Sequence, residues 1–261
     1  MNTKSTLGAL LASFSMVCGP MAALAPQSAA AAPSMGCPQY VSDVKPLKIG
    51  FKWTEGPAWD PANQRWIFSD LMGTTEYGIT PTGQLTKLRE ADYPNGHALL
   101  SSGKFVVAQH NRVLGIVNAD GSNFTVIESK YNGKKLNSPN DVAVAKNGDI
   151  YFTDPTFGLE GYGPVKAKPD LSFKGVYRVR DGKLQLVNDQ LSIPNGIGLS
   201  PDNKTLYISD TSNNGIYTLD VSNFNGKPVS ANKLFIFDAN IVYIFITTKI
   251  ICYKQLFLLE D

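Results

Sequence analysis

Residues 195–210 read Asn195-Gly-Ile-Gly-Leu-Ser-Pro-Asp-Asn-Lys-Thr-Leu-Tyr-Ile-Ser-Asp210, with two short apolar runs on either side of a Ser-Pro-Asp-Asn turn. This pattern, which opens on a polar residue, occurs three more times, in residues 55–70, 95–110 and 140–154. In chain order, the first and last residues of the four copies are 15, 15, 14 and 15 positions apart. Two strands around a tight turn have this spacing, so each copy predicts an antiparallel hairpin.

Further alternating stretches follow each hairpin. Runs such as Val176-Tyr-Arg-Val-Arg180 and Gly215-Ile-Tyr-Thr-Leu-Asp220 predict a third strand, and runs such as Leu184-Gln-Leu-Val187 predict a fourth. Four-stranded units repeated every 40 to 55 residues are typical of β-propeller blades, which bury both faces only when they stack around a channel. Sustained helical periodicity is missing from this part of the sequence, which excludes an α/β fold. We therefore predict an all-β chain with about four propeller blades.

The first 33 residues have the pattern of a secretory signal peptide. Lys4 precedes an apolar region, and Ala29 to Ala32 form a small-residue cleavage region. No uninterrupted apolar run reaches the roughly 18 residues that a membrane-spanning helix needs. The sequence thus predicts a secreted or periplasmic protein with no membrane segment after cleavage. In that compartment Cys37 and Cys252 form either one disulfide or two free thiols.

The rest of the chain divides into two parts. Residues 34–240 are predicted to form an incomplete propeller, and residues 241–261 a tail foreign to the repeat, because the tail lacks Gly and Pro. Across the chain, 24 Lys and Arg residues against 22 Asp and Glu residues give a net charge of +2, and no basic run is present. This balance argues against a nucleic-acid partner. The expected partner is a small molecule.

The four hairpins begin with Glu55, Asn95, Asn140 and Asn195. The innermost strands of propeller blades start at one end of the channel, so these side chains are expected to converge. One carboxylate with several amide oxygens suits Ca²⁺ or a similar divalent ion. Taken singly, each Asn is also a common turn residue, and a Glu at a strand edge is usually solvated. Recurrence at one phase of the repeat favours the metal site for all except Asn95, for which both interpretations stay open.

Four segments together resemble the gluconolactonase and senescence-marker-protein (regucalcin) family and its diisopropylfluorophosphatase-like relatives. They are Glu55-Gly-Pro-Ala-Trp59, Leu136-Asn-Ser-Pro-Asn-Asp-Val142, Tyr151-Phe-Thr-Asp-Pro155 and Pro194-Asn-Gly-Ile-Gly-Leu-Ser-Pro-Asp202. The resemblance covers about 190 residues. It implies a six-bladed propeller that hydrolyses small sugar lactones such as gluconolactone with a divalent cation, Ca²⁺ being favoured over Zn²⁺ or Mg²⁺. It also implies that Glu55 and Asn195 bind the metal and that Asn140 binds metal or substrate.

Members of that family carry a later Pro-Asp-Gly segment, in the fifth blade, whose Asp is implied to be a metal ligand and the catalytic base. This sequence contains no such segment. The catalytic residue is therefore unassigned, and we expect a truncated member with impaired lactonase activity. Two alternatives stay open: a non-catalytic propeller that binds a small molecule or a protein, and a metal-dependent phosphotriesterase-like hydrolase.

The sequence holds two histidines, His97 and His110, both in the second copy of the pattern. His110 is placed at the end of the second hairpin. There it binds substrate together with Asn95 and Asn140, shuttles protons, or has a structural, hydrogen-bonded role, and these alternatives stay open.

Asp residues close the other three hairpins, at positions 70, 154 and 210. We expect Asp70, Asp154 and Asp210 to lie away from the cation site. Their predicted role is hydrogen bonding in turns and between blades.

Overall fold

The computed structural model of the chain describes residues 47–164 and 166–236. The predictions for residues 1–33 and 241–261, and for Cys37 and Cys252, lie outside these residues. Within them the one helix, α1 (Phe157–Glu160), is four residues long. No helix in the described part of the chain is long and apolar enough to cross a membrane.

The described chain forms four antiparallel sheets of four strands each. The first sheet contains β1 (Thr54–Asp60), β2 (Arg65–Asp70), β3 (Thr75–Ile79) and β4 (Leu85–Glu90), and the second contains β5 (Pro94–Leu99), β6 (Phe105–Gln109), β7 (Val113–Val117) and β8 (Thr125–Glu128). The third contains β11 (Val142–Val144), β12 (Ile150–Asp154), β13 (Gly175–Arg180) and β14 (Lys183–Asn188), and the fourth contains β15 (Pro194–Leu199), β16 (Thr205–Asp210), β17 (Gly215–Asp220) and β18 (Asn232–Ile236). A small hairpin, β9 (Lys130–Tyr131) and β10 (Lys134–Lys135), separates the second sheet from the third.

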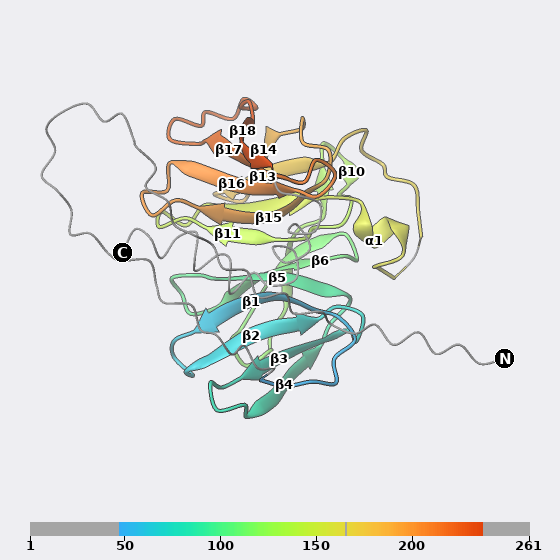
Figure 1. The fold of residues 1–261 in the computed structure, drawn as a ribbon, viewed down its shortest axis with the longest axis vertical. Helices are drawn as coiled ribbons and strands as arrows, with labels where there is room; N and C mark the ends of the chain where they lie inside the picture. Colours follow the sequence, from blue (N-terminus) through green and yellow to red (C-terminus); the bar gives the residue numbers. More distant parts are fainter. Residues whose placement is uncertain (1–46, 165, 237–261) are drawn as a thin grey trace, which may run out of the picture. The chain divides into compact units, whose positions relative to one another are not determined.

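In every four-stranded sheet the strands pair in chain order, as the repeat predicted. β5 contacts β1 and β2 on one side and β11 on the other, and β15 contacts β11 and β12. Figure 1 shows the first strand of each sheet: β1, β5, β11 and β15 follow one another in space in the same order as in the sequence. This order of neighbouring inner strands is the one that a propeller requires. The total of six blades stays a prediction.

The alternation of side chains along β6 shows how the sheets stack. Its residues Phe105 to Ala108 are all fully buried. Phe105 and Val107 pack toward the first sheet, in a cluster with Ile67. Val106 and Ala108 point the opposite way and join a cluster with the third sheet. Because successive side chains of a strand point to opposite faces, one apolar run contributes to two clusters between sheets.

The first strands approach one another closely at the end where the pattern begins. Ser69 Oγ donates to the carbonyl oxygen of Asn95 at 2.8 Å, Gly96 N donates to that of Asn140 at 2.8 Å, and Thr153 Oγ1 donates to that of Asn195 at 2.6 Å. In each case the donor belongs to the preceding sheet. The backbone of each of these asparagines is therefore fixed by the sheet before it.

Glycine permits this approach at two positions. A Cβ added to Gly56 would overlap the carbonyl oxygen of Asn95, and one added to Gly96 would overlap the backbone of Asn140 and Asp141. The pairing of β1 with β2 and of β5 with β6 also shifts at these glycines, which is the mark of a β-bulge. In the first two copies of the pattern, the Gly after the opening residue is therefore required by packing.

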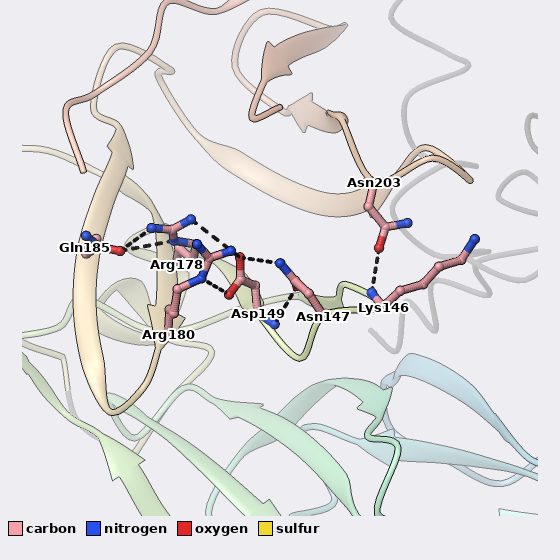
Figure 2. A network of polar contacts seen from close by, with 7 residues as sticks. All are labelled: Lys146, Asn147, Asp149, Arg178, Arg180, Gln185 and Asn203. Carbon is pink, nitrogen blue, oxygen red and sulfur yellow. Dashed lines mark hydrogen bonds and ion pairs between the residues drawn. The ribbon is translucent and has the colours of Figure 1, made fainter. Parts of the chain in front are cut away.

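A network of polar contacts ties the third sheet to the fourth at the other end of the strands (Figure 2). Asp149, next to the start of β12, pairs with Arg178 and Arg180 of β13. In the same turn, Lys146 N donates to Asn203 Oδ1 at 2.5 Å, and Lys146 Nζ donates to a carbonyl of the fourth sheet. The third and fourth sheets are thus joined at both ends of their strands.

The close approach at Gly56 can be tested against Gly103. Both have positive φ, +54° and +78°, but nothing lies within 4 Å of a Cβ added to Gly103. Gly103→Ala should lower the free energy of unfolding by about 1–2 kcal/mol, the strain of a left-handed alanine. Gly56→Ala should cost about 1–3 kcal/mol more because its methyl group is also overpacked. Urea unfolding of both variants measures the difference, and equal losses would contradict the packing argument.

Candidate functional site

A cavity of about 140 Å³ opens at the end of the first strands. It brings together all five residues for which the sequence predicts a role in binding: Glu55, Asn95, Asn140, Asn195 and His110. The other residues that line it are Trp53, Leu71, Phe157, Tyr162 and Thr211. The four sheets each contribute to the wall, so the cavity exists only because the sheets are stacked.

The three Asp residues at the ends of hairpins lie beside this cavity, which corrects the prediction that they lie away from it. The reason is that the end of the second strand of an antiparallel hairpin lies next to the start of the first, and Thr54 pairs with Asp70 and Pro194 with Asp210. Each Asp accepts hydrogen bonds from two N–H groups of its own repeat. These groups lie two and three residues before Glu55, Asn140 or Asn195, the residue that opens the repeat. The bonds join Asp70 to Lys52 and Trp53, Asp154 to Asn137 and Ser138, and Asp210 to Ser192 and Ile193.

These carboxylates hold the loops that lead into the first strands. The turn hydrogen bonding that the sequence predicted for them is confirmed, but these bonds stay within one repeat and do not cross between blades. Burial raises the pKa of Asp154 to about 7, while the N–H groups of Asn137 and Ser138 and the charge of Arg112 act in the opposite direction. The three carboxylates thus stabilise the fold around the site and do not line the cavity.

His110 does not occupy the place of those Asp residues. Pro94 pairs with Gln109, as Thr54 pairs with Asp70, so Gln109 is the equivalent residue. The N–H of His110 donates to the carbonyl of Tyr93, two residues before Asn95. Leu71 and Thr211 make the same bond in their own repeats, and both line the cavity. The predicted end of this hairpin is therefore one residue too far along the chain, and His110 faces the cavity.

The imidazole of His110 is buried among polar groups. Its Nε2 lies 2.9 Å from Nδ2 of Asn95 and 3.2 Å from Nδ2 of Asn140. Its Nδ1 lies 2.6 Å from the carbonyl oxygen of Tyr162. Burial lowers the pKa of His110 to about 4, against a smaller opposing effect of the Tyr162 carbonyl. The ring is therefore neutral at physiological pH.

Glu55 and Asn195, the predicted ligands that do not contact His110, are also oriented by neighbours that line the cavity. Trp53 Nε1 donates to Oε1 of Glu55 at 2.9 Å. Asn195 Nδ2 donates to Oγ1 of Thr211 at 3.0 Å. The amide nitrogen of Asn195, like those of Asn95 and Asn140, is thus used by a protein acceptor, which directs the amide oxygen elsewhere.

An aromatic wall, formed by Trp53, Phe157 and Tyr162, completes the cavity. The ring of Tyr162 lies between the other two, with centroids 5.5 Å from Trp53 and 6.5 Å from Phe157. The sequence pattern does not predict these residues. Tyr162 lies in a long segment containing Gly and Pro between β12 and β13, and Trp53 precedes the first copy of the pattern, so the repeat spacing does not relate the two.

The donor atoms of the cavity fit a hard divalent cation. Glu55 supplies a carboxylate, and the asparagines supply amide oxygens, which are the ligand types that Ca²⁺ accepts. A group of three or more His, Cys, Asp or Glu side chains that could hold a metal is not found among the described residues. A cation here would therefore depend on amide oxygens and a single negative charge.

The comparisons with known proteins agree with the resemblance. Residues 53–240 match the family described as the SMP-30/Gluconolactonase/LRE-like region. A gluconolactonase of Zymomonas mobilis is 33% identical over 211 residues, which cover 73% of this chain and 58% of that protein. A gluconolactonase structure from Xanthomonas campestris is 35% identical with a TM-score of 0.66, and the match covers 72% of this chain and 64% of the other.

A structure of regucalcin from Agrobacterium tumefaciens, a calcium-binding protein, has a TM-score of 0.56 at 20% identity, and the match covers 72% of this chain and 61% of the other. At that identity it supports the β-propeller fold alone. The chain spans 58% of the length of the Zymomonas relative. The family match nevertheless includes every residue of the cavity wall. This chain therefore belongs to the SMP-30/gluconolactonase/LRE-like family.

Proposed function

We propose that this chain is a hydrolase of small sugar lactones that uses a divalent cation, Ca²⁺ first of all, bound in the cavity. One observation carries the proposal. Glu55 and the three asparagines at the starts of successive first strands line a single cavity, in a chain that belongs to the gluconolactonase-like family. The two gluconolactonase relatives match 73% and 72% of the chain.

Glu55, Asn140 and Asn195 would hold the cation, and Asn95 would bind substrate. When bound, a divalent cation polarises the lactone carbonyl and stabilises the negative charge that develops on its oxygen. Trp53 keeps the Glu55 carboxylate in place through its Nε1 hydrogen bond. The aromatic wall of Trp53, Phe157 and Tyr162 excludes water from one side of the cavity and offers a flat surface to the apolar face of a sugar ring.

His110 is a poor candidate for the base that activates water. Its pKa is lowered to about 4, and its Nε2 already accepts from two amides. Among the described residues that line the cavity, Glu55 is the only carboxylate. Because Glu55 would also bind the cation, we propose that turnover by these 261 residues is slow compared with a relative that carries the Pro-Asp-Gly segment.

The cation site predicts a specific effect of Glu55→Gln. This change removes the one formal negative charge from the proposed ligands, so the dissociation constant for Ca²⁺ should rise about 10-fold or more. Glu90→Gln is the matched control, because Glu90 is exposed, lies outside the cavity wall and pairs with Lys87. Isothermal titration calorimetry measures both constants.

Lactone hydrolysis by the same preparations, with and without chelator, separates the candidate functions. Chelator-sensitive hydrolysis of gluconolactone supports the proposal. Binding of Ca²⁺ and lactone without turnover would favour a binding module instead, and hydrolysis of a phosphotriester in place of the lactone would favour the third function. Equal Ca²⁺ affinity in Glu55→Gln and wild type would show that the cation site is wrong.

The aromatic wall predicts an effect on substrate affinity. Tyr162→Leu removes a ring but leaves the Tyr162 carbonyl in the main chain, so the bond to His110 can persist. We expect KM for a six-membered sugar lactone to rise about 3- to 10-fold with little change in kcat, since a ring contact contributes roughly 0.5–1.5 kcal/mol. Steady-state kinetics measure this. A KM that does not change would remove Tyr162 from the substrate site.

A further inference from the structure

We propose that His110 is a positioning residue: its imidazole, hydrogen-bonded to the main chain at Tyr162, fixes the side-chain amides of Asn95 and Asn140 so that their oxygens face the cavity. The effect of His110 on cation binding rests on the proposed function, whereas the positioning of the two amides does not. The geometry depends only on contacts between residues of the chain. Three hydrogen bonds define it, at 2.6, 2.9 and 3.2 Å.

The carbonyl of Tyr162 selects the tautomer of His110. A carbonyl oxygen can only accept a hydrogen bond, so Nδ1, 2.6 Å from it, must carry a proton. In a neutral imidazole the other nitrogen, Nε2, is then an acceptor. The Nδ1–H tautomer therefore follows from a single contact.

The tautomer in turn selects the orientation of two amides. An acceptor at Nε2 attracts the NH₂ group of an amide and repels its oxygen, so both Asn95 and Asn140 must present Nδ2 to the ring. Rotating either amide by half a turn would set a carbonyl oxygen against a lone pair in a buried place. Each Oδ1 is consequently directed away from His110, and both side chains line the cavity.

The segment around α1 is built to deliver the Tyr162 carbonyl to this position. A Cβ on Gly158 would lie 2.6 Å from the carbonyl oxygen of His110 and 2.8 Å from its Cβ. A Cβ on Gly163 would overlap the backbone of Gly158. The two glycines thus let the turn fold tightly against His110. In this way residues 157–163, which belong to no sheet, set the orientation of side chains that start two different sheets.

Two substitutions separate positioning from a general structural role. His110→Gln places an acceptor, Oε1, near the position of Nε2, whereas His110→Leu keeps a similar volume without any acceptor. We expect His110→Leu to weaken Ca²⁺ binding about 10- to 100-fold, as loss of a group that orients metal ligands does, and His110→Gln to stay within about 3-fold of wild type. Calorimetric titration with Ca²⁺ alone measures both, and urea unfolding confirms that the variants are folded.

A third measurement does not involve the cation. Nitrogen-detected NMR of the wild-type imidazoles at pH 7 should show His110 with a protonated Nδ1 and an unprotonated Nε2. Because the chain holds only two histidines, loss of one signal set in His110→Gln assigns it. A protonated Nε2, or equal Ca²⁺ affinity in His110→Leu and wild type, would overturn the proposal. Wild type that fails to bind Ca²⁺ but shows the Nδ1–H tautomer would refute the cation site and leave the positioning role standing.

Discussion

The hydrogen bond from Gly96 N to the carbonyl of Asn140, 2.8 Å long, exemplifies the constraint on which the rest of the structure depends. Inner strands of different sheets meet backbone to backbone, and a side chain at Gly96 would prevent that approach. The hydroxyls of Ser69 and Thr153 make the corresponding contacts to Asn95 and Asn195. Because the carbonyl of each of these residues is tied to the preceding sheet, their side chains stay at a common end of the strands. The cavity is a consequence of how the sheets pack.

The repeat is not uniform, and the site differs from repeat to repeat for that reason. In three repeats an Asp carboxylate holds the two N–H groups that precede the site residue. The second repeat has Gln109 at that place, and Nε2 of Gln109 is buried without a partner among the described residues. The next residue, His110, lines the cavity, as Leu71 and Thr211 do in their own repeats. The repeat that departs most from the pattern therefore supplies the imidazole that contacts two of the asparagines.

The sequence predicted the four hairpins and the convergence of their opening residues, because both follow from a repeat that is visible in the spacing. The register within the second hairpin was predicted one residue out. Leu99 pairs with Phe105, whereas in the fourth sheet Leu199 pairs with Leu206, so this turn is one residue shorter. The distance between the first and last polar residues of a copy does not reveal how long its turn is. The aromatic wall was missed because no local pattern relates Trp53 to Tyr162, which lies 109 positions later in the sequence and touches it only in the folded chain.

The use of the nitrogen atoms in the cavity also bears on which cation the proposed site prefers. Zn²⁺ sites in proteins are mostly built from imidazole and thiolate ligands, and His110 is the only histidine among the residues that line the cavity. Its Nδ1 is bonded to a carbonyl and its Nε2 accepts from two amides, so neither nitrogen offers a lone pair to a metal. Mg²⁺ keeps several of its waters and is usually bound through one or two carboxylates and substrate phosphates, whereas most of the predicted oxygen ligands in the described cavity wall are neutral amides. Ca²⁺ accepts neutral amide oxygens in flexible arrangements of six to eight ligands, roughly 2.3–2.6 Å from the ion. The hydrogen bonds at both imidazole nitrogens thus argue against Zn²⁺, and the neutral amide oxygens argue against Mg²⁺, so the proposed site suits Ca²⁺ best.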